Sequence, residues 1–304
     1  MDTSNLSVAE RLGECCELAI SIGWGVADIL KNARNHDFEV GGAQDSPVTS
    51  ADLAANDYIL SRLHTQLGTT DFGYLSEETF KTQNPIDRLS QDWVWIIDPL
   101  DGTKDYIQNT GEYATHIALA YRGQPMVAVV GCPGKDRLYW AIRGQGSWVN
   151  TAPNSSCGGT SRNSETSLGV VPTRNHISPK NTVSEMTIVT SRNHLGKKLE
   201  DLIKHLGISS HKGMGSVGCK VSTLVDQGAD LYVSIAGKTA PKDWDFAAPE
   251  LILTEAGGRF TYFNGGSISY NCEDINQWHP ILASNSTQHD FICATAQAFL
   301  NQYD

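Results

Sequence analysis

Two aspartates three positions apart, Asp98 and Asp101, stand in the segment DPLDGTKDYI, which runs to Ile107. The five residues before them, 93–97, are all large and apolar, and they predict a buried strand that ends at Asp98. Two carboxylates in a turn with proline and glycine would repel and raise each other's pKa. A bound divalent cation removes that repulsion, and clustered carboxylates can hold such a cation against a phosphate. The segment therefore indicates metal-assisted phosphate chemistry.

Three further acidic residues are ambiguous when each is taken alone. Glu77 stands beside Glu78 in a polar stretch, which is typical of a solvated surface. Asp245 stands where a helix is expected to begin, so its role could be only that of a helix cap. Asp52, three residues after Thr49, could be an ordinary acid of a first helical turn.

The elements that must position these acids alternate between helices and strands. Apolar spacing predicts a long helix from residue 8 and a second helix that begins at 49–52 and ends at Gly68. The first half then favours strands, at 72–75, 93–97, 114–121, 125–132, 138–143 and 147–150. The second half predicts strands at 187–190, 231–235, 259–263 and 281–284, between helices at 197–206, 217–227, 245–255 and 288–300. This alternation favours a layered α/β architecture.

A polar segment separates the two halves. Residues 151–182, rich in serine, asparagine, glycine and threonine, are expected to form a long loop or an insertion around one strand. We place the seam between two subdomains there. The expected division is an N-terminal α+β subdomain over 1–155 and a C-terminal α/β subdomain over 156–304.

Charge and composition exclude several classes of protein. The net charge of −11 argues against binding to a nucleic-acid backbone, and it implies that a phosphate substrate needs local neutralisation, for example by metal ions. No apolar run approaches the ~18 residues of a membrane span, and the N-terminal segment lacks the features of a secretory signal. We expect a cytoplasmic protein without a membrane partner. Its 7 cysteines include no C-x-x-C pair, so we expect reduced thiols and no zinc site.

Four motifs, taken together and in order, resemble those of a known family. They are TSAD with Asp52, SEE with Glu77, DPLDGT with Asp98 and Asp101, and WDFAAPELILTEAGG with Asp245. The family is that of the magnesium-dependent, lithium-sensitive phosphomonoesterases typified by inositol monophosphatase. The resemblance implies an αβαβα sandwich of the inositol monophosphatase and fructose bisphosphatase type. It also implies a metal site in the cleft between the two halves, and inhibition by lithium.

The resemblance implies a role for each motif residue. Two or three Mg²⁺ ions are the expected cofactors, and their expected ligands are Glu77, Asp98, the backbone carbonyl of Leu100, Asp101 and Asp245. Asp52 and Thr103 are the expected catalytic pair, which orients and deprotonates a metal-activated water. Gly102 and Thr103 are expected to begin a helix whose N–H groups bind phosphate oxygens. For Thr103, a helix cap alone is the alternative.

Three segments bear on the identity of the phosphate ester. KDYI, after Thr103, resembles the K-E-F-I of the 3′(2′),5′-bisphosphate nucleotidases, which remove the 3′-phosphate from 3′-phosphoadenosine 5′-phosphate (PAP). SRNH resembles their S-R-x-H segment, in which Ser191 and His194 would contact the nucleotide. GSVGCK resembles their G-S-x-x-K segment, with one extra residue between Ser216 and Lys220. The expected substrate-binding residues are Gly102, Thr103, Ser191, His194, Ser216, Lys220 and Asp245.

Several alternatives stay open at this point. His194 could be a solvated loop histidine and Lys220 an exposed helix lysine. Where bacterial relatives often place an arginine, this chain has Val233 and Ser234, so Lys238 or Lys242 is the candidate for the missing charge.

These resemblances favour an enzyme that hydrolyses PAP to AMP and phosphate. A phosphorylated nucleotide is the only expected partner, and the expected assembly is a monomer or homodimer. An inositol monophosphatase or a fructose 1,6-bisphosphatase on the same scaffold is the alternative. A non-catalytic phosphate-binding regulator is an alternative of another class.

Overall fold

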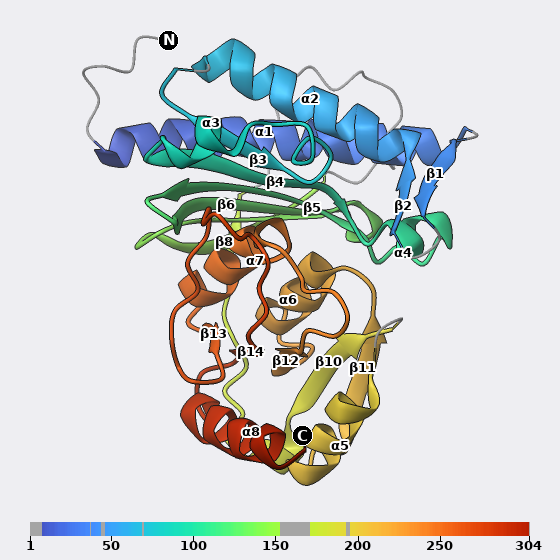
Figure 1. The fold of residues 1–304 in the computed structure, drawn as a ribbon, viewed down its shortest axis with the longest axis vertical. Coiled ribbons are helices and arrows are strands. Elements are labelled where there is room, and N and C mark those ends of the chain that lie inside the picture. The colour runs from blue at the N-terminus through green and yellow to red at the C-terminus, as the bar shows by residue number, and fades with distance from the viewer. Residues whose placement is uncertain are drawn as a thin grey trace.

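Five layers stack in the order helix, sheet, helix, sheet, helix (Figure 1). The computed structural model describes residues 8–36, 38–43, 46–68, 70–152, 171–192 and 195–303. The expected αβαβα sandwich is therefore confirmed. In the part of the chain that the structure describes, no helix is long and apolar enough to cross a membrane.

Two helices form the first layer and cover the outer face of the first sheet (Figure 1). They are α1 (Val8–Arg34) and α2 (Ser50–Leu67), joined by a hairpin of β1 (Val40–Ala43) and β2 (Ser46–Thr49). Ile22 and Val26 of α1 are fully buried and share one hydrophobic cluster with Trp95 and Ile97 of the sheet. Burial of this apolar stripe holds α1 on the sheet.

The first sheet has seven strands in sequential order. They are β3 (Gly73–Ser76), β4 (Trp93–Asp101), β5 (Ala114–Tyr121), β6 (Gln124–Cys132), β7 (Arg137–Ile142), β8 (Gly146–Thr151) and β9 (Thr173–Arg174). Only the β3–β4 pair is parallel among these described strands. Trp95 and Ile97 face α1 and α2, whereas Val94 and Ile96 face the middle helices. Burial on both faces is why the residues of β4 are apolar without alternation.

Short helical turns connect these strands. They are α3 (Pro85–Leu89), α4 (Thr103–Ile107) and a 3₁₀ turn, η1 (Pro133–Lys135).

The middle layer places two helices between the sheets. They are α6 (Val217–Val225) and α7 (Asp243–Glu255), which pack against each other and against β5 and β6. On its other side, α7 contacts β13. Phe246 and Leu251 of α7 are fully buried. A helix that is apolar on most of its surface fits between two sheets.

The second sheet has the strand order β11-β10-β12-β14-β13. Its strands are β10 (Thr187–Ser191), β11 (Ser210–Met214), β12 (Leu231–Ser234), β13 (Arg259–Tyr262) and β14 (Ile281–Ser284). The last layer consists of α5 (Lys197–His205) and α8 (His289–Tyr303), and a 3₁₀ turn, η3 (Val183–Glu185), precedes β10.

The structure differs from the sequence-based expectations at several elements. The β1–β2 hairpin, α3 and β11 were not predicted, and β4 continues to Asp101 instead of ending at Asp98. Strand β9 pairs with β8, so the first sheet includes residues beyond 155. The proposed boundary at 155, and most of the long loop around it, lie outside the described residues. The six described cysteines are free thiols, as expected.

Candidate active site

A bulge in β4 brings Asp98 and Asp101 to the same face of the sheet. Asp98 pairs with His116 and Asp101 with Ala114, so β4 has one more residue than β5 between these pairs. Without that residue, two positions three apart would point to opposite faces. The Pro99 carbonyl accepts a hydrogen bond from Thr115 Oγ1 at 3.0 Å, and the Leu100 N–H donates to Asp98 Oδ1 at 3.1 Å. The DPLD sequence therefore builds the bulge that gathers its own carboxylates.

The structure brings Asp245 to these two aspartates. One oxygen from each of Asp98, Asp101 and Asp245 lies within 4.8 Å of the others. Asp245 is the third residue of α7, and its Oδ2 accepts a hydrogen bond from the Lys242 N–H at 2.6 Å. Glu77 directly follows β3, where its N–H donates to the Ile97 carbonyl at 3.2 Å. Parallel pairing of β3 with β4 places it beside the cluster.

The carboxylates of this cluster oppose one another's ionisation. Burial and the charge of Asp245 raise the pKa of Glu77 to about 8. Burial and the charge of Glu77 raise the pKa of Asp98 well above its usual range. Burial and the charge of Asp101 raise the pKa of Asp245 to about 6. A divalent cation among these oxygens would offset the repulsion, and a donor set made only of oxygen fits Mg²⁺.

Asp101 differs from its neighbours because donors surround it. Its Oδ2 lies 2.6 Å from Ser216 Oγ, 3.1 Å from the Gly218 N–H and 3.2 Å from His116 Nε2. Burial opposes ionisation, but the charges of His116 and Lys220 and the Ser216 hydrogen bond outweigh it and lower the pKa of Asp101 to about 2. All three donors contact Oδ2, and none of them contacts Oδ1.

His116 is a residue of this site that the sequence analysis did not identify. It is fully buried in β5, with Nδ1 3.1 Å from the Trp244 carbonyl. A Cβ atom on Gly218 would lie 2.4 Å from His116 Nε2, so only glycine allows α6 to come this close. The contact of His116 with Asp101 outweighs burial and raises the pKa of the imidazole. Its only sign in the sequence is a histidine inside an apolar strand segment.

Asp52 and Thr103 contact each other, although they lie on separate elements. Thr103 Oγ1 is 3.1 Å from Asp52 Oδ1 and 3.2 Å from the Leu100 carbonyl. Asp52 also closes a capping box at the start of α2, where its Oδ2 accepts hydrogen bonds from the N–H and hydroxyl of Thr49. Burial raises the pKa of Asp52 despite these hydrogen bonds. The carboxyl group is thus held next to the Thr103 hydroxyl.

The expected substrate-binding residues lie in different environments. Gly102 precedes α4 with a left-handed backbone (φ +90°), and Ser216 caps α6. Lys220 is 4% exposed, which excludes an exposed helix lysine, and its ammonium group donates to the Gly215 carbonyl. Ser191 ends β10 and is half-buried. His194 lies outside the described residues.

The raised pKa of Glu77 predicts how the stability of the metal-free protein changes with pH. From about pH 5 to about pH 8, the unfolded chain releases a proton that the folded carboxyl retains. The free energy of unfolding should therefore fall as pH rises through this window, and the stabilisation by Mg²⁺ should grow. Thermal melts in chelator and in Mg²⁺ measure both trends. Glu77→Gln should make the chelator series less steep, because Asp98 and Asp245, whose pKa values are also raised, still contribute. An upward trend for the unmodified protein would contradict the raised pKa of Glu77.

The sequence that forms this fold and this carboxylate cluster matches a known family of phosphatases. Residues 11–300 match the family model described as "Inositol monophosphatase family". The chain belongs to the inositol monophosphatase family and is a phosphatase.

Within that family, this chain is similar to a bisphosphate nucleotidase. The 3′(2′),5′-bisphosphate nucleotidase CysQ of Salmonella typhimurium is 30% identical over 261 residues, which cover 85% of this chain and 93% of the relative.

Two solved structures share the fold. The extragenic suppressor protein suhB from Bartonella henselae superposes with a TM-score of 0.72 at 22% identity, covering 92% of this chain and 97% of that one. An IMPase/NADP phosphatase complexed with Mg²⁺ and phosphate gives a TM-score of 0.72 at 20% identity, covering 94% and 95%.

Proposed function

We propose that this protein removes the 3′-phosphate from PAP, giving AMP and phosphate, with Mg²⁺ as its cofactor. The observation that carries the proposal is the 30% identity to a bisphosphate nucleotidase along 93% of that enzyme. The KDYI segment supports the same subgroup, because it follows Thr103 where those nucleotidases have K-E-F-I. The solved neighbour with Mg²⁺ and phosphate supports the choice of metal.

The residues proposed to hold Mg²⁺ are all oxygen donors at one edge of the first sheet and the start of α7. They are Glu77, Asp98, the carbonyl of Leu100, Asp101 and Asp245. The mutual repulsion of these carboxylates supports their assignment, because it gives the site a strong preference for a cation over an empty state. When bound, Mg²⁺ supplies Lewis acidity and positive charge to the phosphate ester.

Thr103 and Asp52 are the proposed route for the proton of the attacking water. The Thr103 hydroxyl donates to Asp52 Oδ1 at 3.1 Å, so its lone pairs can accept a hydrogen bond from a water. As the water oxygen forms its bond to phosphorus, its proton passes to Thr103 and the hydroxyl proton passes to Asp52. The bond between phosphorus and the ribose 3′ oxygen breaks, and that oxygen leaves with the electron pair and takes up a proton from solvent. Asp52 then releases its proton to solvent. The raised pKa of Asp52 makes its carboxylate a better proton acceptor than an ordinary aspartate.

A phosphate-release panel with Mg²⁺ tests the substrate. It compares PAP, its sulfated relative, inositol 1-phosphate, inositol 1,4-bisphosphate and fructose 1,6-bisphosphate. We expect kcat/KM for PAP to exceed that for inositol 1-phosphate by about 10- to 100-fold, because one charged contact to a second phosphate contributes about 1.5–3 kcal/mol. The Asp98→Asn protein, purified identically, controls for contaminating phosphatases. Faster hydrolysis of inositol 1-phosphate than of PAP would overturn the proposal.

A further inference from the structure

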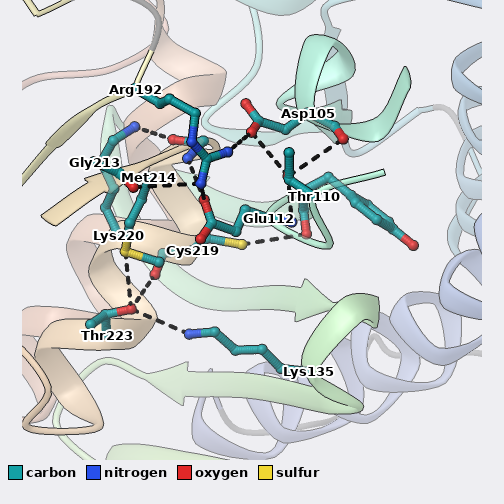
Figure 2. A network of polar contacts seen from close by, with 12 residues as sticks. Asp105, Thr110, Glu112, Lys135, Arg192, Gly213, Met214, Cys219, Lys220 and Thr223 are labelled. Atoms are coloured by element: carbon teal, nitrogen blue, oxygen red, sulfur yellow. Dashed lines mark hydrogen bonds and ion pairs between the residues drawn. The ribbon is translucent and has the colours of Figure 1, made fainter. Parts of the chain in front are cut away.

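Arg192 joins the two halves of the molecule beside the candidate active site. It directly follows β10, and Figure 2 shows its guanidinium group between the carboxylates of Asp105 and Glu112. One nitrogen donates to Asp105 Oδ1, and another donates to Glu112 Oε2 at 2.5 Å. Asp105 lies on α4 and is 2% exposed. The arginine therefore pairs with a buried charge that belongs to the other half of the chain.

Glu112 extends this contact to the turn that precedes α6. Its Oε2 accepts a hydrogen bond from the Gly215 N–H at 2.9 Å, and its backbone carbonyl accepts one from the Ser216 N–H at 3.2 Å. The Arg192 N–H donates to the Met214 carbonyl at 2.9 Å, at the start of the same turn. The turn is thus held from both sides.

Close packing leaves this turn little freedom. A Cβ atom on Gly215 would lie 2.4 Å from Asp105 Cγ and 2.5 Å from the Glu112 carbonyl oxygen. A side chain at this position would push the turn away from the acidic pair. Glycine allows the direct contact, and Arg192 neutralises the two carboxylates that would otherwise repel each other there.

The turn leads directly to Asp101. Ser216 Oγ donates to Asp101 Oδ2 at 2.6 Å, and the Gly218 N–H donates to the same oxygen at 3.1 Å. A continuous path therefore runs from Arg192 through Glu112 to Ser216 and then to Asp101. It also joins the three segments KDYI, SRNH and GSVGCK, through Asp105, Arg192 and Ser216.

We infer that Arg192 is a positioning residue, which holds the turn before α6 in place and thereby aims the Asp101 carboxylate at the cation. Residues that orient a metal ligand through a hydrogen bond typically contribute 10- to 100-fold to metal affinity or activity. The activity part of this inference rests on the proposed function, whereas the metal-affinity part does not.

The test compares Arg192→Met, which removes the charge but keeps a long side chain, with Arg192→Lys. Mg²⁺ affinity is measured by calorimetry without substrate, and kcat and KM are measured with PAP. For Arg192→Met we expect a Kd for Mg²⁺ about 10-fold higher and a kcat about 10- to 100-fold lower. Arg192→Lys should recover part of both losses, because it keeps the charge but not the paired donors. Adding Glu112→Gln to Arg192→Met should add little, since both act along one path.

Arg122→Met is the matched control, because Arg122 also pairs with a carboxylate, Asp92 at 3.0 Å, on an exposed surface. Arg122→Met should change neither the Kd for Mg²⁺ nor kcat. An Arg192→Met protein that circular dichroism shows to be folded, and whose Kd for Mg²⁺ and kcat are unchanged, would overturn the inference. A higher KM for PAP with unchanged Mg²⁺ affinity would also overturn it, since Arg192 would then be a substrate contact. If Arg192→Met does not fold, Arg192→Lys with unchanged Mg²⁺ affinity and kcat overturns it, and weaker binding supports it. Weaker Mg²⁺ binding in a protein inactive on PAP would support the inference and overturn only the proposed function.

Discussion

Asp98→Asn is expected to lower phosphate release from PAP by about 10³-fold or more while leaving the fold intact. Asp98 is 1% exposed at the β4 bulge, and one of its oxygens lies within 4.8 Å of an oxygen from Asp101 and one from Asp245. The carboxamide keeps the shape of the side chain but removes the negative charge that would pair with a cation at the proposed site. Loss of several kcal/mol of charge stabilisation corresponds to about three orders of magnitude in rate.

Phosphate release and thermal melts check this expectation together. The metal-free variant should melt at the same temperature as the unmodified protein or higher, because one of the repelling charges is gone. Asp92→Asn is the matched control, since Asp92 directly precedes β4 but lies on the surface, paired with Arg122. It should retain full turnover. An Asp98→Asn protein with unchanged turnover would exclude the metal mechanism.

Thr103→Ala is expected to lower kcat by about 10²- to 10⁴-fold, the usual contribution of a positioned proton acceptor. The substitution removes the hydroxyl that lies 3.1 Å from Asp52 Oδ1, so a water at the site loses its route to the carboxylate. Mg²⁺ affinity should stay within about twofold, because the proposed ligand at Leu100 is a backbone carbonyl. Single-turnover kinetics and calorimetry separate the two quantities.

Two further variants isolate the proton route. Thr103→Ser keeps a hydroxyl and should retain most of the rate. Asp52→Asn should lose rate to a similar extent as Thr103→Ala, with a stability cost of about 1 kcal/mol because Asp52 also closes the capping box of α2. Full activity in Thr103→Ala would remove Thr103 from the mechanism. Additive losses in the Asp52→Asn, Thr103→Ala double variant would mean that the two residues act separately.

The layered fold was predictable because its strands and helices are buried. Strand β4 lies between two helical layers, so its residues are apolar on both faces, and α1 carries one apolar stripe. Strand β11 (Ser210–Met214) is not buried in this way, because all of its residues except Met214 are exposed at the edge of the second sheet. Pairing with β10 holds this strand in place. Its side chains do not alternate between apolar and polar, so its sequence has no strand pattern. The β1–β2 hairpin was also missed, because it contains Gly41, Gly42 and Pro47, which are residue types that strands disfavour.

The candidate site was predictable where its chemistry depends on neighbours in the sequence. Asp98, Asp101 and Thr103 stand within six consecutive residues, so their types and spacing already indicated a function. The contact of His116 with Asp101 arises only when β5 pairs with β4, and that of Arg192 with Glu112 only when the two halves meet. No local pattern encodes such contacts. The effect of the bulge on the direction of the two aspartates likewise required the strand register.

The position of Asp245 has a consequence for biosynthesis. A ribosome adds every strand of the first sheet, with Asp98 and Asp101, long before it adds α7 (Asp243–Glu255). At that stage the chain contains two of the clustered acids but lacks the third, and it also lacks α6 and α7, which pack on the inner face of the first sheet. If these three acids hold Mg²⁺ as proposed, the unfinished chain cannot bind the ion with full affinity, because the cluster closes only after α7 docks. Tight Mg²⁺ binding at the proposed site would therefore require a chain whose translation has passed α7.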